Sequence, residues 1–207
     1  MQPQSIQDVN PADIHVKREI HRSATSSIYE IELHGATYAM KLVSRDLNRF
    51  RCELTAYGNL LARGVCHRGF VPFFYGHIDR IDPSTLSPPL EHFLNDKYHP
   101  QALILEYLPG TERLNCVNYS EARFRGAVDG IKAIHDAHVH HRDIYPRNIL
   151  ITPDRTVWTD FDVATTFAEM GVLEKEYCEY ETALVVNFGE KLKEDQRRGE
   201  APNCKYY

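Results

Sequence analysis

The stretch HHRDIYPRNILI, from His140 to Ile151, decides the fold that this sequence predicts. It joins a segment of helical periodicity to a short aliphatic run, so we expect a loop between a helix and a strand. Within that loop Asp143 and Asn148 stand five positions apart. Isolated Asp and Asn residues in loops usually form turns with their own backbone. The meaning of this pair therefore depends on what the rest of the chain supplies.

Composition limits the classes of function. The 207 residues are 43% hydrophobic and 26% charged, which suits one globular unit or two small lobes that share a cleft. The formal net charge of −5 argues against nucleic acid or an anionic membrane as a partner. Five scattered cysteines without metal-ligand spacing favour a reducing compartment. Because neither a signal segment nor a spanning helix is indicated, we expect a soluble cytoplasmic protein, with the nucleus as the alternative location.

Alternation of polar and apolar residues predicts an antiparallel sheet in the first half of the chain. Residues 26–33 and 37–43 read as strands around a tight turn at His34-Gly35, and the second strand carries Lys41. Two further strands are expected at 71–75 and 102–107. The other expectations here are a flexible lead-in at 1–13 and a proline-rich surface loop at 79–100, with a short helix near 90–94.

Apolar residues at helical spacing predict helices at 45–63, 120–138 and 173–198. Ser44 is placed to cap the first helix and Gly64 to end it. Glu53 borders the apolar stripe of that helix. In the second half, strands at 149–151 and 157–159 form a hairpin that leads into Asp160-Phe161-Asp162. Because Pro109-Gly110 breaks the chain, we expect an N-terminal part at 14–108 and a C-terminal part at 109–207.

Five polar residues thus stand at the ends of regular elements: Lys41, Glu53, Asp143, Asn148 and Asp160. Their order resembles the signature of protein kinases, in which a lysine strand and a helix glutamate precede the loop H-R-D-x-x-x-x-N and D-F-G. Here these motifs read YAMK, the helix of Glu53, HRDIYPRN and DFD, within roughly residues 16 to 167. The resemblance implies an α+β, bilobal protein-kinase-like fold with an antiparallel-sheet N-lobe and a shortened helical C-lobe.

The resemblance also implies a role for each residue. Lys41 would hold the phosphates of ATP and Glu53 would fix Lys41 by an ion pair. Asp143 would accept a hydrogen bond from the acceptor hydroxyl, with Arg147 beside it. Mg²⁺ prefers oxygen ligands, usually one or two carboxylates plus phosphates. The expected metal ligands are Asn148, Asp160 and Asp162, and the expected nucleotide contacts besides Lys41 are Ser23, Ser26, Glu106 and Leu108.

The sequence departs from the protein-kinase pattern in several places. Residues 20–28 contain no glycine where kinases carry G-x-G-x-x-G, so side chains limit the approach of phosphates and serine hydroxyls would have to donate instead. Tyr145 stands where serine/threonine kinases usually carry lysine, whereas Arg147 has the position seen in some receptor tyrosine kinases. The run DIYPRNIL and the DFD tripeptide also resemble aminoglycoside and choline phosphotransferases. The short C-terminal part resembles small atypical kinases of the RIO and Bud32 type and compact kinase-like proteins of fungi.

Three functions follow from this resemblance. The first is ATP- and Mg²⁺-dependent transfer of a phosphoryl group to a hydroxyl, with protein serine or threonine slightly favoured as the acceptor. The second is a small-molecule kinase of the aminoglycoside phosphotransferase type. The third is a pseudokinase, a binding module without catalysis, which the missing glycines and the altered D-F-G favour. Retention of all five catalytic-type residues argues against the third.

Overall fold

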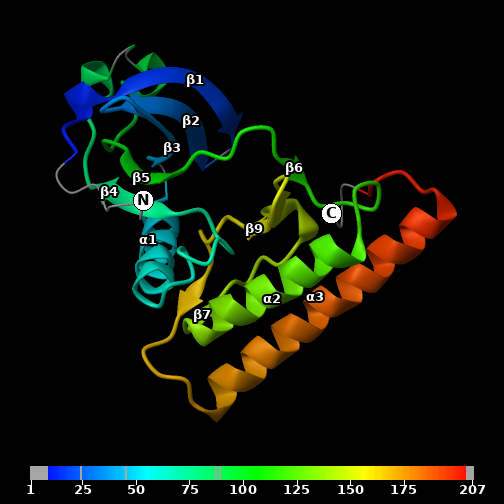
Figure 1. Ribbon diagram of the computed structural model, residues 1–207. Coiled ribbons are helices and arrows are strands. Elements are labelled where there is room, and N and C mark those ends of the chain that lie inside the picture. The colour runs from blue at the N-terminus through cyan, green and yellow to red at the C-terminus, as the bar shows by residue number, and fades with distance from the viewer. Residues whose placement is uncertain (1–8, 24, 45, 87, 89, 204–207) are drawn as a thin grey trace. The chain divides into compact units, whose positions relative to one another are not determined.

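The computed structural model describes residues 9–23, 25–44, 46–86, 88 and 90–203. The chain divides into two compact units (Figure 1). The first unit comprises Met1–Leu54 and Phe73–Leu108, and the second comprises Thr55–Pro72 and Pro109–Tyr207. The first contains an antiparallel sheet, and two long helices lie within the second. The predicted α+β class is therefore confirmed.

A five-stranded antiparallel sheet of order β1-β2-β3-β5-β4 forms the first unit. His34 and Gly35 join β2 to β3 with φ angles of 51° and 78°, which fits the left-handed pair of a two-residue hairpin turn. The strands are β1 His15–Arg22, β2 Ser26–Leu33, β3 Ala36–Val43, β4 Phe74–Ile78 and β5 Gln101–Glu106. The predicted turn and the strand that carries Lys41 are confirmed.

Two sequence predictions in this unit are wrong. The strand expected at 71–75 is present as β4 but begins only at Phe74, since Pro72 has no N–H to donate to a ladder and the N–H of Phe73 donates to the Glu106 side chain. The segment expected to be a surface loop, 79–100, packs into the core through Ile81, Leu86 and two further apolar residues. Those two are Leu90 and Phe93, and the segment also holds the short 3₁₀ helices η2 Pro83–Thr85 and η3 Glu91–Phe93.

Helix α1, Leu47–Ala62, begins in the first unit and ends in the second. Its cap is not Ser44, whose hydroxyl donates to Asp96 Oδ2 at 2.6 Å. Asp46 Oδ1 accepts instead from the backbone N–H groups of Asn48 and Arg49, both at 3.1 Å. The carboxylate lies two and three residues before these donors, which is the usual geometry of an N-cap. As predicted, Gly64 follows the helix in the left-handed conformation, with φ of 76°.

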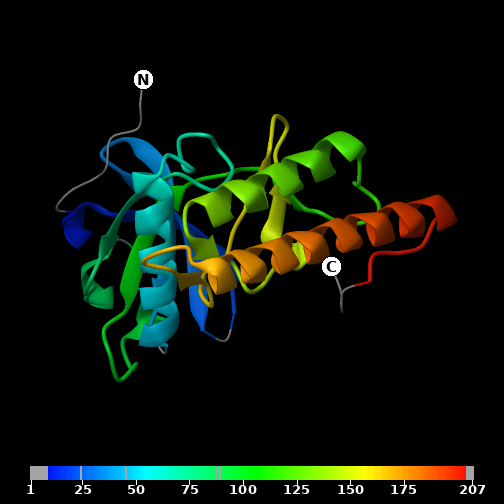
Figure 2. The same ribbon diagram turned by 90° about the horizontal axis from the view of Figure 1, so that it is seen from below.

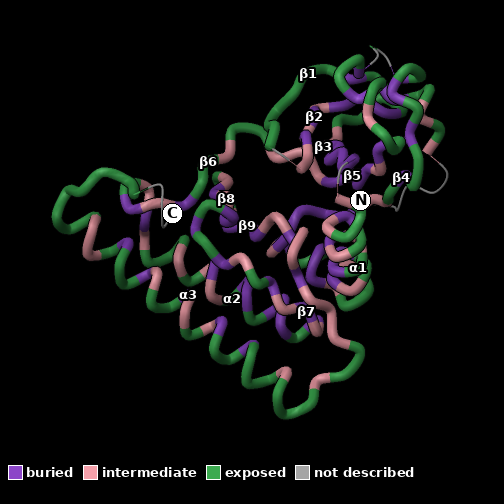
Figure 3. The backbone as a smooth tube through the Cα atoms, turned by 180° about the vertical axis from the view of Figure 1, so that it is seen from behind, coloured by how far each residue is buried: buried purple, intermediate pink, exposed green. Residues whose placement is uncertain are grey.

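In the second unit α2, Glu121–Asp136, and α3, Val172–Arg198, lie side by side (Figure 2). The buried residues of α3 recur every three or four positions and line one face, and the opposite face is exposed (Figure 3). Both helices agree with their predicted ranges to within two residues. Small strand pairs complete the unit: β6 Glu112–Arg113 with β8 Ile149–Ile151, β8 with β9 Thr156–Trp158, and β7 Val139–His140 with β10 Thr165–Thr166. Within the described residues no helix combines the length and apolarity needed to cross a membrane.

Close packing of α3 on α2 gives the first testable prediction. A Cβ at Gly189 would lie inside the van der Waals surface of the Phe124 ring, whereas a Cβ at Gly58 in α1 would meet nothing within 4 Å. We expect Gly189→Ala to lower the free energy of unfolding by ~1–3 kcal/mol through overpacking. The same change at Gly58 should raise it by ~0.5–1 kcal/mol, because alanine is the better helix former. Urea unfolding measures both, and equal effects would contradict the packing observed here.

Candidate active site

One candidate group of functional residues is an ion pair in the first unit. Lys41 lies on the central strand β3, paired with Ile28 on one side and Leu103 on the other. Its Nζ lies 2.7 Å from Oε2 of Glu53 in α1, and the two side chains are only 7% and 1% exposed. A charge buried this deeply is tolerated only when it is paired. The ammonium has three N–H donors, so the pair is compatible with further contacts to anionic oxygens.

The turn between β1 and β2 contains Ser23 and Ser26, which the sequence predicts to contact a nucleotide. Ser23 N–H donates to the carbonyl of Ser26 at 2.8 Å, and Ser23 Oγ accepts from the N–H of Ser26 at 3.0 Å. The two hydroxyl oxygens are 3.2 Å apart, and the N–H of Thr25 also reaches Ser23 Oγ. The serines therefore close the hairpin, and their contact with a nucleotide stays a prediction.

Glu106 and Leu108 lie at the end of the first unit and are both half-buried. Glu106 N–H donates to the carbonyl of Phe73 at 2.8 Å, and Glu106 Oε2 accepts from the N–H of Phe73 at 3.0 Å. The carboxylate of Glu106 is thus bonded to the backbone beside β4. A nucleotide contact at either residue stays a prediction.

A separate candidate group of functional residues lies in the loop that follows β7 in the second unit. Arg147 Nη2 donates to both carboxylate oxygens of Asp143, at 3.1 and 3.2 Å, and its guanidinium lies 4.5 Å over the ring of Tyr145. Asn148 Nδ2 donates to the carbonyl of Asp143 at 2.8 Å. This bond uses the nitrogen end of the amide, so the oxygen end is the one that can bind a cation. The loop thus brings Asp143, Arg147 and Asn148 together.

The His141 ring holds the backbone of this loop through hydrogen bonds. The side chain is buried, and its Nδ1 accepts from the N–H of Asp143 at 3.3 Å while Nε2 lies 3.1 Å from the carbonyl of Thr159. These bonds fit a neutral ring with its proton on Nε2. Burial lowers the pKa of His141 and favours the same neutral form. The ring also packs on Phe161, with centroids 4.7 Å apart, so a structural role fits this residue.

Asp160 follows β9 in the left-handed conformation, with φ of 69°. The residue before it, Thr159, donates its N–H to the carbonyl of Asn148 at 2.9 Å, which links the two expected metal-binding segments through their backbones. Carboxylate and amide oxygens fit the preference of Mg²⁺. Asp162 lies two residues further and is half-buried. Within the described residues, no three His, Cys, Asp or Glu side chains gather as a metal site.

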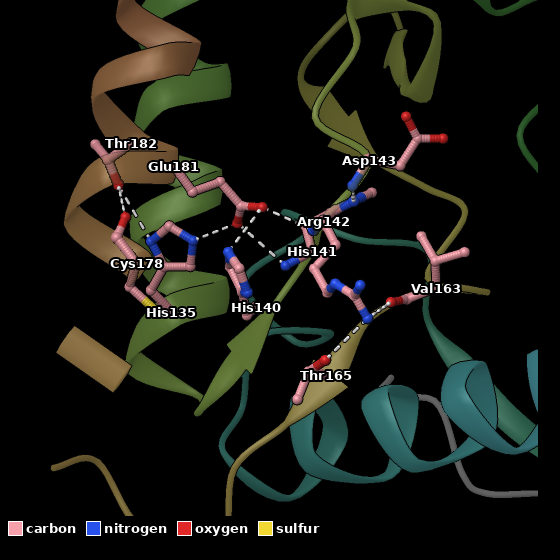
Figure 4. Close-up of polar contacts among 10 residues, drawn as sticks. All are labelled: His135, His140, His141, Arg142, Asp143, Val163, Thr165, Cys178, Glu181 and Thr182. Carbon is pink, nitrogen blue, oxygen red and sulfur yellow. Dashed lines mark hydrogen bonds and ion pairs between the residues drawn. The ribbon is translucent and has the colours of Figure 1, made fainter. Parts of the chain in front are cut away.

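Sequence reasoning missed one residue of this site, Glu181 on α3. Its side chain is buried, and its carboxylate accepts the backbone N–H groups of His141 at 3.1 Å and Arg142 at 2.7 Å (Figure 4). Arg142 has a φ of 68°, a left-handed conformation that costs ~1–2 kcal/mol for a residue with a side chain. Glu181 therefore holds the strained start of the Asp143 loop. The sequence does contain a sign that Glu181 is buried. Glu181 lies three residues after Cys178 and four before Val185, and both of these buried residues are apolar.

Comparison with known proteins gives a limited similarity. No protein-family model matches the chain. A segment of 78 residues, about a third of the chain, is 33% identical to serine/threonine-protein kinase chk-1 of Caenorhabditis briggsae, and the match covers 16% of that protein. The chain is thus similar to a serine/threonine kinase over part of its length, as the signature residues led us to expect.

Proposed function

We propose that this protein is a phosphotransferase of the kinase type, which uses ATP and Mg²⁺ to phosphorylate a hydroxyl group. The observation that carries the proposal is the buried pair of Lys41 and Glu53, with 2.7 Å between Nζ and Oε2. Replacing a buried ion pair by apolar residues is often neutral or even stabilising, so such a pair is weak support for a purely structural role. A cation fixed on a rigid strand is what positioning of a polyphosphate requires.

In this proposal each residue has one role. Lys41, held by Glu53, binds phosphate oxygens. Asp143 accepts a hydrogen bond from the hydroxyl group that is to be phosphorylated, and so orients it. Hydrogen bonds to the backbone of residues 141–143 hold Asp143 in place for this role. Arg147, which now pairs with Asp143, neutralises negative charge beside it. Asn148, Asp160 and Asp162 would hold Mg²⁺, which neutralises charge on the phosphates when it is bound.

A protein hydroxyl is the acceptor that we slightly favour. The relative from Caenorhabditis briggsae is a serine/threonine-protein kinase by name, and the HRD spelling of the loop agrees with that class. Tyr145 and Asp162 instead resemble small-molecule phosphotransferases. Phosphate transfer from radiolabelled ATP to a protein mixture and to a set of hydroxylated metabolites distinguishes the two acceptors.

A binding module without catalysis is the second candidate. The turn between β1 and β2 favours it, because the hydroxyls of Ser23 and Ser26 bond to each other and to the turn backbone. Such a module would keep the fold, and it would not need Mg²⁺ to hold its ligand.

Thermal unfolding with and without nucleotide separates the two candidates. A ligand at 100 times its dissociation constant stabilises the native state by about 2.7 kcal/mol, which corresponds to a rise of roughly 5–10 °C in a chain of this size. We expect ATP with Mg²⁺ to produce such a rise, and ATP with a chelator to produce a clearly smaller one. Asp160→Asn should remove the Mg²⁺-dependent part, and Asp129→Asn on the exposed face of α2 should keep it. A shift that is independent of Mg²⁺ would instead support the binding module.

A further inference from the structure

Two histidines, the buried His135 and the half-buried His140, contact the carboxylate of Glu181 and form a cluster with it (Figure 4). His135 on α2 places its Nε2 2.7 Å from Oε2, and His140 on β7 places its Nε2 3.3 Å from Oε1. The side chains of His135 and Glu181 are only 8% and 4% exposed. The same carboxylate accepts hydrogen bonds from the backbone N–H groups of His141 and Arg142. The cluster thus connects two helices to the start of the Asp143 loop.

A carboxylate this deeply buried needs a compensating positive charge. The guanidinium of Arg142 does not supply it, because Nη1 donates to the carbonyl of Val163 and to Thr165 Oγ1, while only the backbone N–H of Arg142 reaches Glu181. The groups that contact the carboxylate and can become cationic are the rings of His135 and His140.

His140 is the neutral member of the cluster. Its ring stacks against Phe167 and Tyr177, with centroid distances of 6.2 and 6.0 Å. Burial lowers the pKa of His140, and the nearby carboxylate of Glu181 offsets this only in part. A neutral ring with its proton on Nε2 can still donate to Oε1.

The contacts of His135 are compatible with a doubly protonated ring. Its Nε2 lies at the short distance typical of a charge-assisted bond to a carboxylate. Its Nδ1 lies 3.1 Å from Thr182 Oγ1, and that hydroxyl lies in donating geometry 3.0 Å from the carbonyl of Cys178. A hydroxyl has one proton, so if it donates to the carbonyl it must accept from Nδ1. Both ring nitrogens of His135 then carry hydrogen.

We propose that His135 is an imidazolium ion in the folded protein. Its positive charge keeps Glu181 ionised where the carboxylate binds the backbone at the start of the Asp143 loop. The loop is then ordered by a buried ion pair, in which Glu181 is a positioning residue and His135 holds its charge. Only the consequence for phosphate transfer rests on the proposed function. The protonation state itself and the order of the loop do not.

Each element that packs against His135 and Glu181 carries further titratable or charged groups. His135 and other residues of α2 and α3 line a pocket of about 570 Å³. The titratable and charged groups around the cluster are Lys132, Asp136 and His138 beside His135 on α2 and the turn that follows, Lys175, Tyr177, Cys178 and Glu179 on α3, and His140, His141 and Arg142 on β7 and the loop. Burial raises the pKa of Cys178 to about 11, so its thiol is uncharged at neutral pH.

The direction of the acid dependence follows from Glu181 and His140. Burial by itself would raise the pKa of Glu181, but the hydrogen bond from His135, the backbone N–H of Arg142 and the positive charge of His135 lower it. A lowered carboxyl pKa contributes stability that is present above the unfolded value and is lost as the pH falls through the folded one. The lowered pKa of His140 acts in the same direction, because its protonation is disfavoured in the fold. Acid should therefore loosen the cluster.

The first test observes the proton directly and needs no activity. In the full chain with ¹⁵N-labelled histidine, we expect both ring nitrogens of His135 to show protonated chemical shifts at neutral pH, with the signals assigned by their loss in His135→Gln. Glu181→Gln should return His135 to a neutral ring, and Glu176→Gln on the exposed face of α3 should not. A neutral His135 in the wild-type chain, with Nδ1 accepting from Thr182, would overturn the proposal.

The second test measures the order of the loop by amide hydrogen exchange of residues 139–145 at constant pH. Glu181→Gln should speed exchange there by about 10- to 100-fold, the factor expected for the loss of a bond to a charged group. His135→Gln keeps a donor but removes the charge, so it should also speed exchange, whereas His15→Gln on β1 should not. Unchanged protection in both cluster variants would refute the positioning role. If protection falls while no phosphate transfer is found even in the wild type, the proposed function fails and this inference stands.

Discussion

Asp143→Ala should reduce phosphate transfer by about 10²- to 10⁴-fold, the range expected for loss of a catalytic base. The carboxylate lies on a loop whose backbone is held by Glu181, His141 and Asn148, so truncation of the side chain removes the acceptor contact without moving the loop. The affinity for ATP and Mg²⁺ should change little, because the proposed ligands of the nucleotide are other residues. Initial rates of transfer and nucleotide titrations measure the two effects separately.

Two variants control this prediction. Asp129→Ala removes a carboxylate from an exposed position on α2 and should leave the rate unchanged. Arg147→Ala removes the partner that now bonds both oxygens of Asp143 and should lower the rate less than Asp143→Ala does. An Asp143→Ala protein that transfers phosphate as fast as the wild type would eliminate Asp143 as the base.

Lys41→Met should lower the free energy of unfolding by ~3–5 kcal/mol and should also abolish transfer, since it leaves the buried carboxylate of Glu53 without its cation. Glu53→Leu should cost a similar amount because it leaves the ammonium of Lys41 buried. The double variant should recover most of the stability, as apolar residues of similar volume often replace a buried pair without loss. It should remain inactive, because the cation that binds phosphate is still missing.

A matched ion pair on the same sheet provides the control. Lys17 and Glu32 also lie 2.7 Å apart, but their side chains are 41% and 45% exposed. An exposed pair is worth only ~0–1 kcal/mol, so Lys17→Met should have little effect on unfolding. Urea unfolding of all four variants tests the role of burial. Equal costs at Lys41 and Lys17 would contradict it, and an active double variant would remove Lys41 from the mechanism.

The local elements of this protein were predictable from its sequence. Helices α2 and α3, the hairpin turn at His34-Gly35 and the strand of Lys41 follow from periodicity and from turn residues, which are properties of short segments. Prediction failed where a distant residue competes for a side chain. The hydroxyl of Ser44 bonds to Asp96 and therefore does not cap α1. The prolines of 79–100 likewise led to the prediction of a surface loop, whereas four apolar residues of this segment pack into the core.

The same division holds at the candidate site. The sequence alone determined which residue types are present and in which order, from Lys41 through Asp143 to Asp160. Only the tertiary structure decided that Lys41 and Glu53 are buried together and that Glu181 carries the backbone of the Asp143 loop. The physical reason is that burial and charge pairing depend on segments far apart in the chain, 40 residues in the case of Glu181 and His141. A periodicity reports which face of a helix is buried, but not which backbone a carboxylate on that face will bind.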